Sequence, residues 1–253
     1  MAPCVFKRLP RSVIPIRYEI EVKPCFLSFK FTGTLSLSVS ATGARQVFPC
    51  LDEPEFKSVF SIKLHIPKGK TAISNMPLLS KVEHDENIVA FHFQDTPKMS
   101  TYLVAFAVGD LEYTEATDKN GVLVRVYSRK GLLSEQSQGS VALNVACHCL
   151  PFYGEYFGIK YPLPKVDLLA VPNIERLLLA NPHTLSPATK EAITTVISHE
   201  IAHMWFGNLV TMEWWTDLWL KEGFAAWIEY FCSDHCYPEM DIWVRHSDRF
   251  FHT

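Results

Sequence analysis

The sequence predicts an α+β fold, in which an antiparallel β-rich N-terminal part is followed by a helical part. Two observations predict it. Up to about residue 127, apolar and polar residues alternate in short runs, which is typical of strands with one buried face. From about residue 128 the apolar spacing follows the period of a helix. The length of 253 residues, 48% of them apolar, suits one large or two modest domains.

The strands expected in the first part differ in how much of their surface is buried. Leu35, Leu37 and Val39 alternate with serines, which predicts a half-buried strand. The run 102–108 is apolar at consecutive positions and therefore predicts a central strand that is covered on both faces. The strands expected in this part are 35–40, 60–66, 89–93 and 102–108.

Helices and one buried strand are expected in the second part. Ser186 is a favourable N-cap and Pro187 suits the first helical position, so a helix is expected to begin there. It should run to about Phe206, because Gly207 is a favourable helix end. The segments expected are a helix over 140–157, a strand over 166–171, and helices over 187–206 and 216–232.

The most specific signal is an H-E-x-x-H motif at His199, Glu200 and His203. Residues four apart share one face of a helix, so the two imidazoles can bind one metal ion, and the glutamate between them can act as general base. Glu222 on the following helix has the chemistry of a third ligand, which completes a set that catalytic zinc sites use with one position left open. Either histidine alone is more often a structural residue. Together the four residues predict one Zn²⁺ ion whose water is activated to hydrolyse a peptide bond.

Other residues near this motif have two interpretations. Glu229 either orients a metal ligand or lies on the solvated face of its helix, and Asp217 either joins the site or favours the dipole at a helix start. The cysteine–histidine runs 147–149 and 232–236 are expected to be structural, because no second half of a metal site follows them. Six aromatic residues are expected to pack in the core around the two helices, with a pocket wall as the alternative; they are Trp205, Phe206, Trp214, Trp215, Trp219 and Trp227.

Composition and charge exclude several classes of function. The net charge of −3 with 20% charged residues leaves no basic stripe for a nucleic acid and no bias toward a membrane surface. No apolar run reaches the roughly 20 residues needed to span a bilayer, and the first residues lack the apolar core of a secretory signal. Seven cysteines without framework-like spacing indicate reduced thiols. A cytoplasmic location is therefore expected, with no nucleic-acid or membrane partner.

The motifs also carry a family resemblance over nearly the whole chain. The segments around H-E-x-x-H and Glu222, with three segments upstream, resemble the M1 (gluzincin) family of zinc aminopeptidases; they are 199–211, 214–225, 48–54, 99–106 and 161–165. The stretches 227–230 and 234–236 look most like the puromycin-sensitive, cytosolic branch of that family.

The resemblance implies two domains and an activity. Residues 1–127 are expected to form a β-rich saddle domain, and residues 128–253 a thermolysin-like zinc peptidase domain. The implied zinc ligands and general base are the same four residues that the motif predicts. The implied function is a zinc metalloaminopeptidase that releases N-terminal amino acids from peptides, so peptides are the expected substrates.

Three features depart from the family pattern. The family's G-A-M-E-N strand, whose glutamate holds the substrate amine, is absent; the stretch 168–177 leads directly toward the motif, with Glu175 nearby. The β domain is shortened at 40–45. The family's transition-state-stabilising tyrosine and its helical C-terminal domain have no counterpart up to Thr253. The peptidase domain is therefore expected to be incomplete at its C-terminal end.

These departures keep a second class of function open. The alternative to an active aminopeptidase is a catalytically impaired zinc-binding fragment with a binding or regulatory role. It follows because loss of one oxyanion-stabilising donor typically costs about 10²–10³ in rate. Endopeptidase activity is a third, less favoured outcome, which would follow from loss of the group that anchors the substrate amine.

Overall fold

The computed structural model describes residues 11–12, 14–23, 37–38, 44–133, 138–172 and 174–244. Nine strands precede the first α-helix of the described chain, and a tenth, β10 Lys165–Leu169, follows it. The nine are β1 Arg17–Val22, β2 Leu37–Ser38, β3 Val59–Pro67, β4 Thr71–Ser74, β5 Leu78–Glu83, β6 Ile88–Phe93, β7 Phe106–Gly109, β8 Leu111–Thr117 and β9 Leu123–Arg129. The α-helices of the described chain are α1 Ser140–Tyr156, α2 Glu175–Leu178, α3 Pro187–Ala202 and α4 Leu218–Cys236. Short 3₁₀ turns lie at Ala44–Gln46, Thr101–Leu103, Trp215–Asp217 and Pro238–Met240. The α+β prediction is confirmed.

The described strands form three sheets, with the orders β1-β3-β6-β5, β2-β7-β4 and β10-β9-β8. Most neighbouring strands are antiparallel, as expected. β1 departs from this expectation because it runs parallel to β3, and β10 runs parallel to β9. Parallel neighbours need a long connection. The chain between Val22 and Val59 provides it for the first pair, and α1 with its flanking segments provides it for the second.

β3 and β6 confirm the strands expected at 60–66 and 89–93. The strand expected over 102–108 is shorter, since β7 begins only at Phe106. Before it, the N–H groups of Leu103 and Val104 bond to carbonyls three residues back and form a 3₁₀ turn. Of the strand expected at 35–40, the two residues of β2 pair with β7, and the others lie outside the described residues.

α1 and α3 begin where the sequence predicts. The Ser186 hydroxyl accepts a hydrogen bond of 3.1 Å from the Thr189 N–H, and Pro187 opens the helix. This cap satisfies one of the free N–H groups of the first turn. α4 covers most of the expected second helix and extends one turn further, to Cys236.

α3 ends earlier than expected, at Ala202 instead of Phe206. After it, the N–H groups of Met204 and Trp205 bond to carbonyls three residues back, so tighter turns replace the helix. Gly207 then adopts a φ of 133°, which side chains other than glycine rarely allow. The chain therefore leaves the helix axis directly after the second histidine of the motif.

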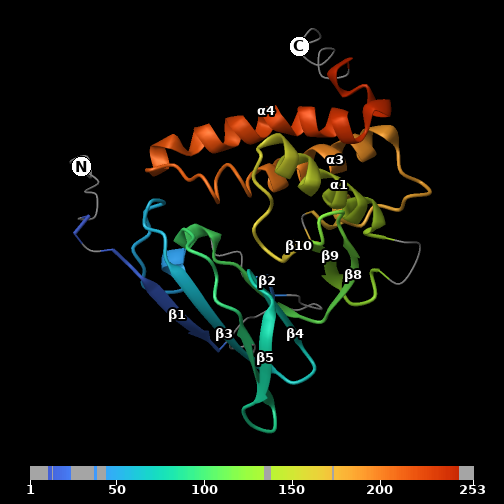
Figure 1. Cartoon of the computed structure of the whole chain (residues 1–253). Helices are drawn as coiled ribbons and strands as arrows, with labels where there is room; N and C mark the ends of the chain where they lie inside the picture. Colours follow the sequence, from blue (N-terminus) through green and yellow to red (C-terminus); the bar gives the residue numbers. More distant parts are fainter. Residues whose placement is uncertain are drawn as a thin grey trace, which may run out of the picture.

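Two hydrophobic cores hold these elements. In the first, Phe60 and Leu64 of β3 are completely buried between the sheet of β1 and the sheet of β7. In the second, Val126 of β9 packs in one cluster with Ile197 of α3 and Ile228 of α4. Figure 1 shows the sheet of β8–β10 beneath α1, apart from the sheet of β1 and β3. That sheet therefore belongs with the helices, and the domain ranges 1–127 and 128–253 stay a prediction.

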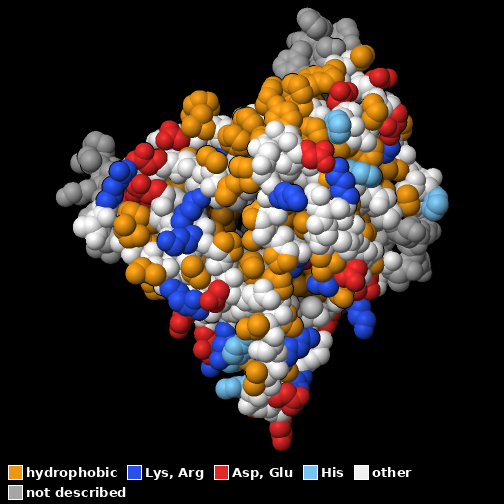
Figure 2. All heavy atoms as spheres, viewed as in Figure 1, with side chains coloured by type: hydrophobic (Ala, Val, Ile, Leu, Met, Phe, Trp, Pro, Cys, Tyr) orange, Lys and Arg blue, Asp and Glu red, His pale blue; other side chains and the backbone are white. Residues whose placement is uncertain are grey.

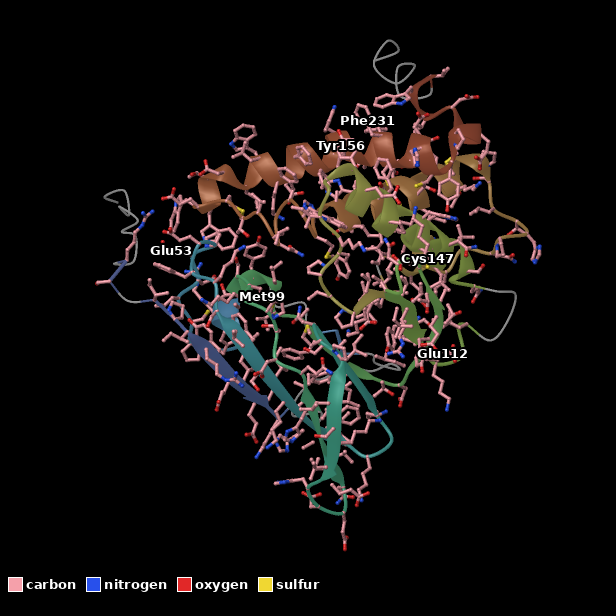
Figure 3. The ribbon with its side chains drawn as sticks, in the orientation of Figure 1. Glu53, Met99, Glu112, Cys147, Tyr156 and Phe231 are labelled. Atoms are coloured by element: carbon pink, nitrogen blue, oxygen red, sulfur yellow. The ribbon has the colours of Figure 1, made fainter. Side chains whose placement is uncertain are left out.

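The six aromatic residues expected in the core differ in burial: one is buried, two are exposed, and three are half-buried, namely Phe206, Trp214 and Trp215. Trp205 is 3% exposed and lies in the second core. The prediction is wrong for Trp219 and Trp227, which are 67% and 45% exposed, because α4 turns only one face toward the other helices. Figure 2 shows hydrophobic side chains along the top of the molecule over α4, and Figure 3 shows Phe231 on the upper side of that helix. No helix among the described residues is both long and apolar enough to cross a membrane.

Candidate metal centre

Two packed helices hold the H-E-x-x-H motif and Glu222 beside each other. His199 lies in the last turn of α3, and Glu222 lies in the second turn of α4. The facing sides of these helices are apolar, with Ile197 of α3 in the same buried cluster as Ala225 and Ile228 of α4. Burial of such side chains fixes the distance between the helices and therefore the spacing of the polar groups at their ends.

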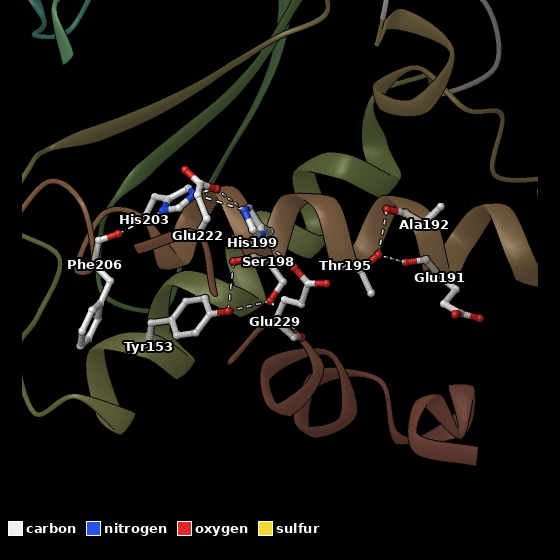
Figure 4. A network of polar contacts seen from close by, with 10 residues as sticks. All are labelled: Tyr153, Glu191, Ala192, Thr195, Ser198, His199, His203, Phe206, Glu222 and Glu229. Carbon is white, nitrogen blue, oxygen red and sulfur yellow. Dashed lines mark hydrogen bonds and ion pairs between the residues drawn. The ribbon is translucent and has the colours of Figure 1, made fainter. Parts of the chain in front are cut away.

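Three donor atoms converge between these helices, as Figure 4 shows. The Nε2 atoms of His199 and His203 are 3.1 Å apart. Glu222 Oε2 lies 3.5 Å from the Nε2 of His199 and 3.3 Å from that of His203. His203 follows the last residue of α3 but keeps helical backbone angles (φ −58°, ψ −22°), so it still shares a face with His199. The structure thus brings the three predicted ligands together.

The second nitrogen of each imidazole is held by the protein. His199 Nδ1 lies 2.6 Å from Glu229 Oε2, and His203 Nδ1 lies 3.0 Å from the carbonyl oxygen of Phe206. Both partners are acceptors, so both Nδ1 atoms donate. In the neutral imidazole this leaves Nε2 without a proton and with its lone pair toward the other donors. The hydrogen bond to Glu229 raises the pKa of His199 against the effect of burial, which makes this imidazole a stronger electron donor.

The spacing of the three donors fits a tetrahedral metal ion. Donors held about 2.0–2.1 Å from a tetrahedral zinc ion lie about 3.3–3.4 Å apart. The observed separations are 3.1, 3.3 and 3.5 Å. The lone pairs of three donor atoms at such distances repel one another. A single proton can bridge only two of these atoms, whereas a metal ion at their centre binds all three. The donor set of two imidazoles and one carboxylate therefore fits zinc.

Glu222 forms the open side of the site. Its side chain is 45% exposed, against 22% for His199 and 12% for His203. Lys221 Nζ lies 2.8 Å from Glu222 Oε1. Burial acts to raise the pKa of Glu222, but Lys221 and the two histidines outweigh it and lower this pKa below its ordinary value. The carboxylate is therefore ionised at neutral pH, which is the form that binds a metal.

Glu200, the predicted general base, is exposed on α3 directly after the first histidine. Its charge adds to the effect of Glu229 in raising the pKa of His199. The Glu200 carboxylate is thus open to water and close enough to this imidazole for their charges to interact.

The structure favours one interpretation of Glu229, because this carboxylate contacts His199, a predicted ligand. Its position two turns after Glu222 on the same face of α4 is the signal in the sequence. The Phe206 carbonyl that holds His203 was not predicted, because no side-chain type marks it. Asp217 precedes α4 without a capping hydrogen bond from its side chain. Glu175 is engaged elsewhere, since Arg129 of β9 bonds both its oxygens at 2.9 and 3.0 Å.

Two family models match this chain. The model for the "Peptidase M1 N-terminal domain" matches residues 38–103, and the model for the "Peptidase family M1 domain" matches residues 173–251. The chain belongs to the M1 peptidase family. The second matched range includes all the donors described above and the exposed Glu200.

Similar M1 proteins occur in plants and animals. Aminopeptidase M1-A of Oryza sativa subsp. japonica is 45% identical over 218 residues, which are 80% of this chain and 24% of the relative. The puromycin-sensitive aminopeptidase of Caenorhabditis elegans is 45% identical over 225 residues, 83% of this chain and 23% of the relative. Endoplasmic reticulum aminopeptidase 1 of Homo sapiens is 44% identical over 230 residues, which are 85% of this chain and 24% of the relative. This M1 chain therefore spans about a quarter of the length of the curated relatives it matches.

Proposed function

We propose that this chain is a zinc-dependent aminopeptidase, which releases N-terminal amino acids from peptides. The observation that carries the proposal is the convergence of His199 Nε2, His203 Nε2 and Glu222 Oε2 at separations of 3.1 to 3.5 Å. Membership of the M1 peptidase family and the names of its aminopeptidase relatives support the reaction and the substrate class. The proposed metal is a single Zn²⁺ ion.

The chain contributes to this chemistry by presenting its ligands in one protonation state. Bound by His199, His203 and Glu222, zinc supplies a Lewis acid that lowers the pKa of a water from 15.7 to about 7. Glu229 and the backbone after α3 keep both imidazoles in the tautomer with a free Nε2. Lys221 keeps the Glu222 carboxylate ionised. These contacts fix the donors before any substrate binds.

Glu200 is the general base in this proposal. Its exposed carboxylate lies on α3, the helix that carries His199 and ends just before His203, where solvent reaches it. It accepts a proton from the attacking water and returns that proton to the nitrogen of the departing amine. One residue thus serves first as base and then as acid.

Peptides are the proposed substrates, and the cytoplasm is the proposed location. The support for the location is the state of the cysteines in the described chain, which are free thiols; they are Cys50, Cys147, Cys149, Cys232 and Cys236. Unpaired thiols, some of them close to one another, suit a reducing compartment.

The test compares hydrolysis of a fluorogenic aminoacyl amide by the wild type, Glu200→Gln and the matched control Glu86→Gln, which alters an exposed turn between β5 and β6. We expect Glu200→Gln to keep its bound zinc and to lose about 10²–10⁴ in kcat/KM, the usual contribution of a general base. The control should keep wild-type activity. A zinc-loaded wild type without turnover would contradict the aminopeptidase proposal, and wild-type rates in Glu200→Gln would contradict the role of this residue.

A further inference from the structure

A second group of side chains with metal-ligating chemistry lies outside the candidate centre of His199, His203 and Glu222. Cys149 of α1 meets Cys232 and Cys236 of α4, and the three Sγ atoms all lie within 4.8 Å of one another. The cysteines of α4 are four residues apart and therefore share one helix face. The sequence around Cys232 and Cys236 does not reveal the third cysteine, because Cys149 lies on a helix far away along the chain. The packing of α1 against α4 supplies it.

The spacing of these sulfurs fits a metal ion and does not fit a disulfide. A metal bound about 2.3 Å from each of three sulfurs in a plane holds the sulfurs about 4.0 Å apart. The Sγ atoms of Cys232 and Cys236 are 4.0 Å apart. A disulfide needs about 2.05 Å, and all three cysteines are free.

The burial and the pKa values of these three cysteines favour the binding of a cation. Cys149 and Cys232 are completely buried, while Cys236 is half-buried and is the most accessible of the three. Hydrogen bonds from these two thiols lower the pKa of Cys236, and His235 and His148 lower it further. The contact with the other two sulfurs raises the pKa of Cys149, and burial raises that of Cys232. The pKa of Cys236 is therefore the one that favours a thiolate, while those of Cys149 and Cys232 are shifted the other way.

We propose that Cys149, Cys232 and Cys236 form a second metal site, which binds one Cu(I) ion. Thiolates select soft ions such as Cu(I) over Mg²⁺, Ca²⁺ or Mn²⁺. Structural zinc sites take four ligands, and no fourth histidine, cysteine or carboxylate donor joins these three within the described chain. The ion binds to thiolates, so binding releases a proton from each thiol that is still protonated, and the oxidation state of the copper does not change.

The test is an anaerobic titration of the full chain with Cu(I) in competition with a chromophoric Cu(I) chelator. We expect one Cu(I) per chain, a sulfur-to-metal charge-transfer band in the ultraviolet, and three sulfur neighbours in X-ray absorption. Cys236→Ser should lower the Cu(I) affinity by more than about 100-fold, because the loss of even an outer partner of a metal ligand costs about 10–100-fold. Cys149→Ser should do the same from the other helix.

Two controls keep the outcome decisive. Cys50→Ser removes a thiol that lies outside the cluster, and His203→Ala disrupts the histidine site, so neither should change the affinity for Cu(I). Thermal unfolding of each variant shows whether it is folded. Cys236→Ser should disturb folding least of the cluster variants, because its position is only half-buried. Unchanged Cu(I) affinity in folded Cys236→Ser, or a bound ion without sulfur neighbours, would overturn the proposal and leave the cysteines as small packing residues.

Discussion

His199 and His203 each use one ring nitrogen for a contact with the protein, which leaves the other free for a ligand. The two contacts differ in strength, because His199 donates to a carboxylate and His203 donates to a neutral carbonyl. Glu229, with a side chain only 14% exposed, is therefore the residue next to the site whose loss should matter most. It acts through His199 and does not itself lie among the three converging donors.

Replacement of Glu229 by glutamine tests this positioning role. The amide is neutral and a weaker acceptor, so His199 loses both orientation and basicity. We expect zinc affinity to fall by about 10–100-fold, measured by competition with a zinc chelator. Asp234→Asn, on the same helix, serves as the matched control and should bind zinc as the wild type does. Equal affinities in the two variants would show that Glu229 does not position the ligand.

The thiolate character of Cys236 predicts an unusual pH dependence of alkylation in the metal-free chain. The pKa of Cys236 is lowered by its two thiol neighbours, whereas burial raises the pKa of Cys50 to about 11. Only the thiolate reacts, so alkylation of Cys50 should rise about tenfold per pH unit through the neutral range. Alkylation of Cys236 should change little over the same range, because its thiolate is already formed. Mass spectrometry of the labelled peptides measures both rates, and parallel pH profiles would contradict the prediction.

At the scale of elements, the features that the sequence predicts are those that depend on neighbouring residues. β3 and β6 follow from alternation, and the start of α3 follows from Ser186 and Pro187. The features it did not predict depend on distant partners. Glu229 reaches His199 only because α4 packs on α3, and Cys149 completes its cluster only because α1 packs on α4. The parallel pairing of β1 with β3 is of the same kind.

The capping of α3 gives a stability prediction. Ser186→Ala removes the acceptor for the Thr189 N–H and leaves that group without its partner in the cap. The free energy of unfolding should fall by about 1 kcal/mol, measured by urea denaturation. Ser80→Ala, on strand β5 with every residue exposed, is the matched control. It should change the free energy of unfolding by less than about 0.5 kcal/mol. A cap variant as stable as the control would show that the first turn of α3 does not depend on this serine.

At the scale of the whole molecule, the β-rich part contacts the segment that follows the motif helix. Lys57, just before β3, donates to the carbonyls of Asn208 and Leu209 at 3.0 and 2.9 Å. The Tyr102 hydroxyl donates to the carbonyl of Gly207. Asn208 in turn bonds back to the carbonyl of His203. The β-rich part therefore supports the loop that follows His203 in the candidate metal centre.

Removal of the Lys57 ammonium tests this support. Lys57→Met keeps the length of the side chain but leaves two carbonyls without their charged donor. We expect the free energy of unfolding to fall by about 1–3 kcal/mol and amide hydrogen exchange in residues 207–210 to become faster. Lys98→Met, at an exposed position, is the matched control and should leave both unchanged. Faster exchange in both variants, or in neither, would show that Lys57 does not hold this loop.

The central claim is that His199, His203 and Glu222 together bind zinc. X-ray absorption at the zinc edge tests it most directly, on the purified chain loaded with a single equivalent of zinc, alongside His203→Ala. The account predicts nitrogen and oxygen neighbours at about 2.0–2.2 Å without sulfur, and loss of this signal in the variant. Sulfur neighbours at about 2.3 Å, or a spectrum that His203→Ala leaves unchanged, would contradict it.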